Sequence, residues 1–346
     1  MYMIKHNELD MYVVPVAFDH MLYLMYSKTT EDASYFRENG FVRFETEKNL
    51  SSDYLSQLIK QIKDLNCVVC LDMRYVSSYV SRGFAPIKKQ NLPVIFANVF
   101  ADNVGLRNRL KSDISELKVY ENCPEVLCTE NESAREAANR KNFLEEIEAL
   151  YQEKTRLLLN SVAIEKDDQF DTLLESSSVY VNCYIALKKL FLDIENALFI
   201  VYRMAQLILT GCEDWREATL ICCSKTGAAF TSLLSAFLGI PAVYCINIGP
   251  KFALDVVHLK KEVKEGQNYI YVFDFLCMGT EAKILYALLS ILGANLIYGV
   301  GVANYLNISA PEFVQSIFGR FRTLIHIPDV IPHYAIRPIV KRSEEI

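Results

Sequence analysis

The second half of the chain alternates short apolar runs with longer stretches whose apolar residues recur at helical spacing. The short runs are rich in aromatic and β-branched residues and lack polar alternation, which is typical of strands buried on both faces of a parallel sheet. The predicted strands are 218–223, 242–246, 269–273 and 294–303. One predicted helix ends at Leu238, and another spans 282–292. This repeated strand and helix order predicts a doubly wound α/β fold.

The first half also has an α/β pattern. A helix is predicted over 51–65, where Leu55, Leu58, Ile59 and Ile62 share one face and Ser51 or Ser52 is the cap. A short helix is predicted between the strands at 67–73 and 93–99, which makes a βαβ unit. Strands are predicted at 41–46, 67–73, 93–99 and 118–120, and a further helix at 108–117.

An acidic segment joins the two halves. From Glu130 to Glu175 the chain has twelve acids against six lysines and arginines, and apolar residues recur at helical spacing. The pattern predicts a long amphipathic helix. A coiled coil that makes a homodimer and docking of the helix onto one domain both fit its irregular heptads. At 346 residues two domains are expected, and we divide the chain into domains at 1–125 and 178–346 with a helical linker at 126–177.

Composition narrows the classes of partner. The net charge of −6 and the pI near 5.6, with no basic stripe, argue against a nucleic-acid surface or an anionic membrane surface. The most hydrophobic long stretch, 180–210, contains charged residues from Lys188 to Arg203, so it is not a membrane span. Ten cysteines without a signal sequence indicate a reducing, cytoplasmic location. Cys67 and Cys70 lie three apart in a strand and lack a second pair, so no protein metal site is predicted.

The segment YIYVFDFLCMGTEAK, 269–283, combines a buried strand, a carboxylate at Asp274 and a short turn that opens a helix. It resembles the phosphoribosyl-diphosphate signature of the type I phosphoribosyltransferases, where a strand ends in two acids before a T-x-G-T turn. Asp274 matches the second acid, while Phe273 occupies the place of the first. The resemblance implies that Asp274 binds the ribose hydroxyls and that the turn binds the 5′-phosphate. The matched turn is Cys277, Met278, Gly279 and Thr280.

Upstream residues extend this resemblance. The strand at 218–223 is followed by Ser224, Lys225, Thr226 and Gly227, which match the family's pyrophosphate loop, and Gly239-Ile240-Pro241 matches its lGIP turn. The polar stretch 247–268 matches the family's flexible catalytic loop, which implies catalytic roles for Lys251 and His258. The resemblance also implies Mg²⁺ bound with the diphosphate. An ordinary βα junction is the alternative for the signature segment alone.

The first half resembles the STAS domain, from about Met11 to Tyr120. The match is sharpest over Asp72–Phe84, where Ser81 lies on the serine that is phosphorylated in regulatory members and Val80 replaces the neighbouring aspartate. The resemblance implies a protein-binding domain and makes Ser81 a candidate regulatory residue. The alternative for Ser81 is a helix N-cap.

The sequence therefore supports three hypotheses. The first is a phosphoribosyltransferase that transfers phosphoribose to a nucleobase or similar acceptor. The second is a non-catalytic sensor or scaffold that binds a phosphorylated ribose or nucleotide and passes the signal through its STAS-like domain. The third is assembly alone, in a larger stress or phage-defence complex. The absent first acid at Phe273 favours the second hypothesis, and the long loop before the signature favours the first.

Overall fold

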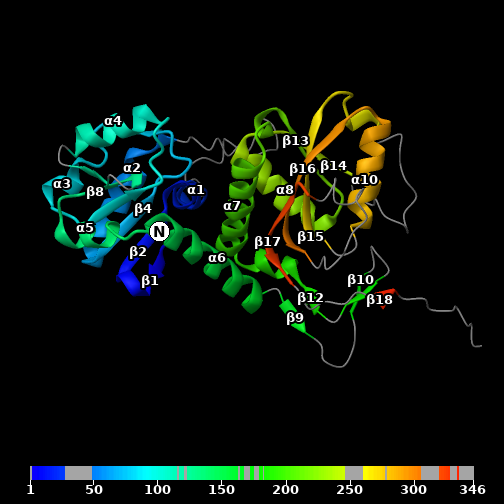
Figure 1. Cartoon of the computed structure of the whole chain (residues 1–346), viewed down its shortest axis with the longest axis horizontal. Helices are drawn as coiled ribbons and strands as arrows, with labels where there is room; N and C mark the ends of the chain where they lie inside the picture. The colour runs from blue at the N-terminus through cyan, green and yellow to red at the C-terminus, as the bar shows by residue number, and fades with distance from the viewer. Residues whose placement is uncertain are drawn as a thin grey trace, which may run out of the picture. The chain divides into compact units, whose positions relative to one another are not determined.

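The chain folds into two compact units, Met1–Lys154 and Thr155–Ile346. A computed structural model (Figure 1) describes most of both units. The residues described are 2–27, 49–114, 117–120, 123–162, 164–166, 172–174, 179–181, 183–245, 260–276, 279–304, 319–327 and 333–334. The strand predicted at 41–46 lies outside them. None of the helices within these ranges is both long and apolar enough to cross a bilayer.

The first unit contains a six-stranded sheet in the order β1-β2-β4-β6-β8-β7. β2, β4 and β6 are parallel neighbours, and β1 and β8 pair antiparallel at either side of them. A separate parallel pair joins β3 to β5. The strands are β1 (Ile4–His6), β2 (Met11–Pro15), β3 (Asn49–Leu50), β4 (Val68–Asp72), β5 (Ser78–Tyr79), β6 (Val94–Ala97), β7 (Lys118–Tyr120) and β8 (Cys123–Cys128).

Helix α2 of this unit forms as its sequence predicts. It begins after Ser51, whose side chain accepts a hydrogen bond from the Tyr54 backbone N–H, and its predicted apolar face is buried. The helices of the unit are α1 (Val16–Ser27), α2 (Ser52–Leu65), α3 (Ala85–Lys89), α4 (Val104–Asp113), α5 (Glu132–Ala138) and α6 (Phe143–Val162), with a 3-10 turn η1 (Asn7–Leu9).

The segment predicted as a long helical linker begins differently. Residues 126–128 complete β8, and two helices follow, α5 and α6, instead of one. Asn131 caps α5 through its side chain, and the polar stretch 139–142 separates the helices. α5 packs on β4, β6 and β8, because its small apolar face is buried there. That face is Ala134, Ala137 and Ala138.

A buried carboxylate ties α6 to this sheet. Asp72 ends β4 and is 0% exposed. Its oxygens accept hydrogen bonds from Asn98 Nδ2 at 2.8 Å and from the Tyr151 hydroxyl of α6 at 2.9 Å. The Arg74 backbone N–H donates at 3.1 Å, and the Arg74 guanidinium lies 3.8 Å away. A buried charge needs such partners, because its desolvation is costly.

Tyr151→Phe is therefore expected to lower the free energy of unfolding by about 1–3 kcal/mol, since it removes one donor to a buried carboxylate. Urea denaturation of the full chain measures the change. Tyr12→Phe on β2, where Tyr12 is half-buried, is the matched control. Equal losses in the two variants would contradict a specific role for the Tyr151 hydroxyl.

The second unit contains a five-stranded, all-parallel sheet in the order β14-β13-β15-β16-β17. α7 and α8 contact one another and the sheet, and α10 covers the opposite face (Figure 1). This confirms the doubly wound arrangement predicted for this half. The strands of this sheet are β13 (Thr219–Cys222), β14 (Ala242–Tyr244), β15 (Asn268–Leu276), β16 (Asn295–Asn304) and β17 (Phe321–His326).

The second unit also contains helices and short antiparallel strands. The helices are α7 (Ile194–Gly211), α8 (Lys225–Leu238) and α10 (Thr280–Ile291), with 3-10 helices η2 (Leu187–Leu192) and η3 (Trp215–Glu217). Short antiparallel strands pair β9 (Ile164–Lys166) with β12 (Cys183–Ile185), and β11 (Val179–Val181) with both β10 (Thr172–Leu174) and β18 (His333–Tyr334).

Phe273 is a core residue on the α10 face of this sheet. It is 1% exposed and stacks on Phe321 with ring centroids 5.8 Å apart. The ring lies over the backbone of Gly301 on β16, where an added Cβ would come within 2.0 Å of it. The position that matches the first acid of the signature is thus filled by an aromatic ring that packs in the core.

Candidate functional site

The carboxyl ends of β13 and β15 form the candidate site. These strands are adjacent, and their following helices leave in opposite directions, α8 toward β14 and α10 toward β16. A point where the connections diverge in this way leaves a crevice outside the carboxyl ends of the strands, and ligands of open α/β sheets bind in such crevices. The site therefore lies where the backbone topology alone favours one.

Helix α8 presents its amino end to this crevice. Ser224 is the N-cap, and its Oγ accepts a hydrogen bond from the Gly227 backbone N–H at 2.9 Å. A Cβ on Gly227 would lie 2.6 Å from that Oγ and 3.5 Å from the Val272 carbonyl oxygen of β15. Glycine thus lets the first turn of the helix approach the neighbouring strand closely.

The segment 224–227, predicted as a pyrophosphate loop, is accordingly the cap and first turn of a helix. Lys225 is exposed and Thr226 is half-buried. The first N–H groups of a helix lack partners within it and attract anions. These residues form a helix end instead of a loop, and their role in phosphate binding stays a prediction.

Helix α10 presents a second amino end to the same crevice. Its N-cap is Gly279, whose φ of 66° is in the left-handed region that glycine adopts without strain, and Thr280 is the first helical residue. Cys277 and Met278, predicted to share this turn, lie outside the described residues. β15 continues to Leu276, two residues past Asp274, although the strand was predicted to end there.

Asp274 lies between the two helix ends. Its Oδ1 accepts a hydrogen bond from the Phe275 backbone N–H at 2.9 Å. Burial raises the pKa of this carboxyl, although hydrogen bonds from the Phe275 backbone and the Ser224 hydroxyl act in the opposite direction. Desolvation with few compensating partners is typical of groups at functional sites.

Glu281 is a second carboxylate at this place, which sequence reasoning missed. It lies in the first turn of α10, and its pKa is raised to about 7, first by burial and second by the charge of Asp274. A hydrogen bond with the side chain of buried Tyr271 lowers that pKa in part. The signal available in the sequence was an acid one residue after the Gly-Thr turn, where acids also occur as ordinary N-terminal helix residues.

Glu281→Gln is expected to make stability less dependent on pH. A carboxyl whose pKa is higher in the folded chain binds protons on folding, so stability falls as pH rises from about 4.5 to about 7. The variant does not ionise, so its melting temperature should exceed that of the parent at pH 8, by an equivalent of about 1–3 kcal/mol, and the gain should shrink at pH 5. Calorimetry at both pH values tests this, with exposed Glu213→Gln as the control. A gain of equal size at pH 5 and pH 8 would contradict the assignment.

Buried thiols line the sheet beneath the crevice. Burial is the largest cause that raises the pKa of Cys222 to about 11 and of Cys245 to about 12, and the pKa of Cys223 is also raised. Thiols with such values stay protonated near neutral pH and are poor nucleophiles. Cys222 and Cys223 are therefore core residues, as the sequence predicted.

Lys251 and His258, which the resemblance makes candidate catalytic residues, lie outside the described residues. No group of three or more His, Cys, Asp or Glu side chains in the described ranges is arranged to hold a metal ion.

Ser81 belongs to the first unit and is exposed there. It does not cap a helix, because α3 begins after Phe84, which makes no side-chain capping bond. The backbone N–H groups of Arg82 and Phe84 instead donate to the Asp113 carboxylate at 3.1 and 3.3 Å. The N-cap alternative for Ser81 is therefore wrong, and its regulatory role stays a prediction.

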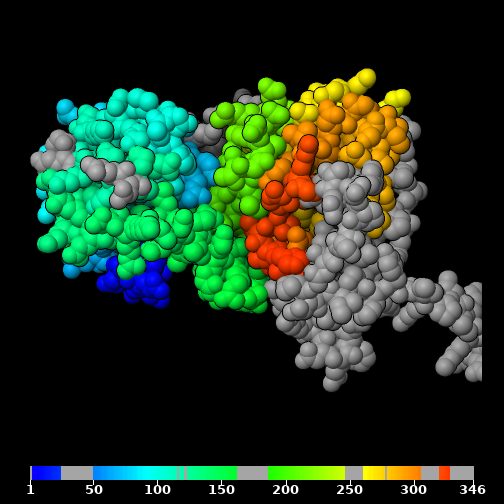
Figure 2. All heavy atoms as spheres, in the orientation of Figure 1, coloured from blue at the N-terminus to red at the C-terminus, as the bar shows by residue number. Residues whose placement is uncertain are grey.

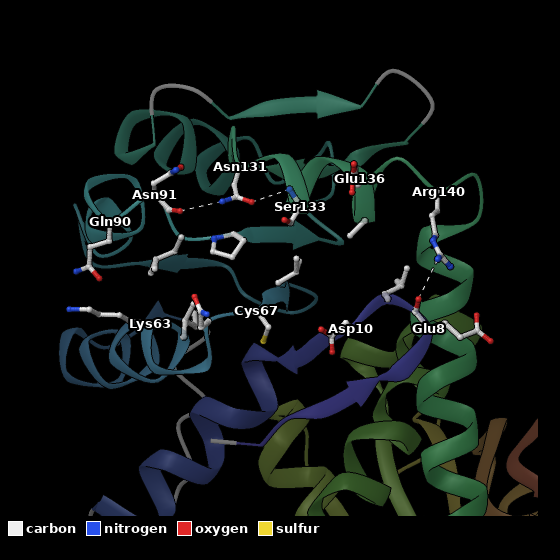
Figure 3. Close-up of a pocket in the computed structure, with 17 residues that line it drawn as sticks. Glu8, Asp10, Lys63, Cys67, Gln90, Asn91, Asn131, Ser133, Glu136 and Arg140 are labelled. Carbon is white, nitrogen blue, oxygen red and sulfur yellow. Dashed lines mark hydrogen bonds between the residues drawn. The ribbon is translucent and has the colours of Figure 1, made fainter.

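The first unit also contains an open pocket of about 630 Å³ at the amino ends of β4 and β6 (Figure 3). Asp10, Asn66 and Asn91 on its rim have positive φ and turn the chain into the strands. Asn131 Nδ2 donates to the Asn91 carbonyl at 3.5 Å, so part of the polar rim is occupied by internal bonds. The pocket lies at the opposite end of the strands from the edge where open α/β sheets bind ligands.

Comparison with known proteins gives structural neighbours only. No family model matches the sequence, and no curated protein matches it significantly. Phosphoribosyltransferases of known structure match about half of the chain. An orotate phosphoribosyltransferase from Aeropyrum pernix has 16% identity and a TM-score of 0.37, covering 50% of this chain and 93% of that chain.

Two adenine phosphoribosyltransferases are similar to the same extent. The enzyme from Thermoanaerobacter pseudethanolicus has 14% identity and a TM-score of 0.39, covering 51% of this chain and 99% of that chain. The enzyme from Trypanosoma brucei, in complex with AMP, pyrophosphate and ribose-5-phosphate, has 11% identity and a TM-score of 0.37, covering 55% and 86%. These scores are low, so what the site binds rests on its own geometry.

Proposed function

We propose that the second unit binds phosphoribosyl diphosphate, or a nucleotide built on the same phosphoribose, in the crevice between β13 and β15. The observation that carries the proposal is the convergence of two helix amino ends on a half-buried carboxylate at a topological switch point. Helix amino ends bind phosphate groups, and a carboxylate accepts hydrogen bonds from ribose hydroxyls.

Each part of the ligand has a proposed contact. The amino end of α8, Ser224 to Gly227, binds the diphosphate, and Gly279 and Thr280 at the start of α10 bind the 5′-phosphate. Asp274 accepts hydrogen bonds from the ribose hydroxyls. Cys277 and Met278 are proposed for the 5′-phosphate turn, and Lys251 and His258 for the loop that closes over the diphosphate, on the sequence resemblance alone.

Mg²⁺ fits this site as an ion held mainly by its ligand. The ion takes oxygen ligands and is commonly bound by one or two carboxylates together with substrate phosphates. The half-buried carboxylates Asp274 and Glu281 supply a donor set of that size. When bound, Mg²⁺ would neutralise charge on the departing diphosphate.

Transfer of the phosphoribose to a nucleobase or similar acceptor is the reaction we propose for this site. Charge develops on the departing diphosphate, and helix amino ends and Lys225 would stabilise it. The test is incubation of the full chain with Mg²⁺, phosphoribosyl diphosphate and a panel of nucleobases, read by pyrophosphate release. Base-dependent release supports transfer.

A non-catalytic sensor is the second candidate, and Phe273 favours it. Its ring is locked in the core over Gly301, so no acid occupies that position. The loss of a transition-state contact lowers turnover more than ground-state affinity. Saturable binding of phosphoribosyl diphosphate in calorimetry, without pyrophosphate release for any base, would support the sensor. Absence of binding by folded protein would contradict both candidates.

For the first unit we propose binding of a protein partner, as the STAS resemblance implies. Val80, directly after β5, and Val104, the first residue of α4, are 47% and 57% exposed, which supports a contact surface there. Co-purification from cells with full-length Val104→Asp, compared with Leu192→Asp in the second unit, tests it. Identical partners in both variants and the parent would count against the proposal.

A further inference from the structure

Asn304 and His326 form a hydrogen-bonded pair at the same sheet edge as Asp274. Asn304 ends β16 and His326 ends β17, and the two residues are partners in the parallel register. His326 Nδ1 and Asn304 Oδ1 are in hydrogen-bond contact. The Ile327 backbone N–H also donates to the Asn304 carbonyl oxygen at 3.0 Å, which fixes the ends of both strands together.

All three side chains lie on one face of the sheet. Successive side chains of a strand point to opposite faces of the sheet, so Asp274 lies on the other face from Phe273, whose ring is on the α10 face. Tyr298 on β16 donates its hydroxyl to the Leu207 carbonyl of α7 at 2.9 Å, so Asn304, six residues later, shares the α7 face. His326 lies five residues after Phe321, which stacks on Phe273, and is likewise on the α7 face.

Their spacing suits the two ends of one ligand. Asp274, Asn304 and His326 lie near the carboxyl ends of neighbouring strands β15, β16 and β17. Two strand spacings are about 10 Å, which is about the length of a nucleoside. β17 is the edge strand of its sheet and lies on the surface of the unit (Figure 2), and His326 is exposed there.

The contact with Asn304 fixes what the imidazole can offer. Asn304 Oδ1 is the atom that faces Nδ1, and since an amide oxygen only accepts hydrogen bonds, this contact favours the tautomer that carries its proton on Nδ1. In the neutral ring Nε2 is then an acceptor, and the bond at Nδ1 orients it. The pair therefore presents a hydrogen-bond acceptor on a fixed ring beside the ribose-phosphate crevice.

We propose that Asn304 and His326 form the acceptor subsite of this crevice, in which His326 Nε2 accepts a hydrogen bond from an N–H group of a heteroaromatic base. The inference rests on the function proposed above. It adds where the base binds and that the protein accepts a hydrogen bond from it. His326 contacts the base, and Asn304 is a positioning residue that acts through the imidazole.

Calorimetry with ribose 5-phosphate and the 5′-monophosphates of adenosine, guanosine, cytidine and uridine tests the subsite, whether or not the protein has turnover. At least one nucleotide should bind the parent protein more tightly than ribose 5-phosphate. His326→Ala should weaken that nucleotide by at least about fivefold and leave ribose 5-phosphate nearly unchanged, since one hydrogen bond is lost. Thr323→Ala, on the same strand but the other face, is the matched control and should change neither ligand.

Two Asn304 variants separate positioning from a structural role. Asn304→Ala should weaken the nucleotide in the same direction as His326→Ala, and Asn304→Gln, which keeps an amide oxygen for Nδ1–H without adding a charge, should retain more of the affinity. Unchanged nucleotide affinity in His326→Ala, or an equal loss for ribose 5-phosphate, would overturn the subsite. A panel in which no base adds affinity would also overturn it. If ribose 5-phosphate and phosphoribosyl diphosphate both fail to bind, the proposed function itself fails, which is a distinct result.

Discussion

Asp274→Asn is expected to weaken binding of phosphoribosyl diphosphate by about tenfold or more and to slow any base-dependent pyrophosphate release by about a hundredfold. The carboxylate faces the crevice between the two helix amino ends, and the amide that replaces it carries no charge to stabilise a cationic ribose. Titration calorimetry in the presence of Mg²⁺ measures the affinity, and the release assay measures turnover.

The same variant is expected to fold at least as well as the parent at pH 7. Burial raises the pKa of Asp274, so ionisation of this group opposes folding and its removal does not cost stability. Exposed Asp214→Asn is the matched control for both measurements. Parent-like affinity in a folded Asp274→Asn protein would exclude Asp274 from the ribose site.

The strands and helices were predictable where the sequence pattern and the packing agree. The apolar runs in the second half became parallel strands because both faces of that sheet are covered by helices. The helix over 51–65 was predictable from its cap and its apolar face. The single long helix expected after Glu130 was wrong, because three alanines carry too weak a helical pattern to mark α5 as part of the first unit.

The site was only partly predictable, because the sequence pattern does not show which separate elements meet at one place. Asp274 was singled out because the strand was predicted to end there, although β15 continues to Leu276. Glu281 was missed, because its pairing with Asp274 depends on where α10 begins. The contact between Asn304 and His326 could not be read from the sequence, since 22 residues separate them and only the parallel register brings them together.

Phe273→Asp, which would restore the signature's first acid, is expected to destabilise the second unit instead of improving the site. Phe273 is 1% exposed and packs between Tyr271, with ring centroids 5.2 Å apart, and Phe321. Loss of the ring costs about 3–5 kcal/mol, and an unpaired carboxylate in the core adds a desolvation penalty. Urea denaturation should show at least that loss, or no folded protein.

Phe273→Leu and Gly301→Ala decide whether packing is the cause. Phe273→Leu should cost less than Phe273→Asp, because it keeps an apolar side chain in the core. Gly301→Ala should be strongly destabilising alone, since its Cβ would lie 2.0 Å from the Phe273 ring. In the Phe273→Leu background its cost should fall, which a double-mutant cycle measures as a coupling energy. Additive costs would mean that the ring does not lie on Gly301. Coupling would mean that the sheet accommodates an aromatic residue at 273 through the glycine on the neighbouring strand. A second carboxylate at this site then has to come from another element, as Glu281 does from α10.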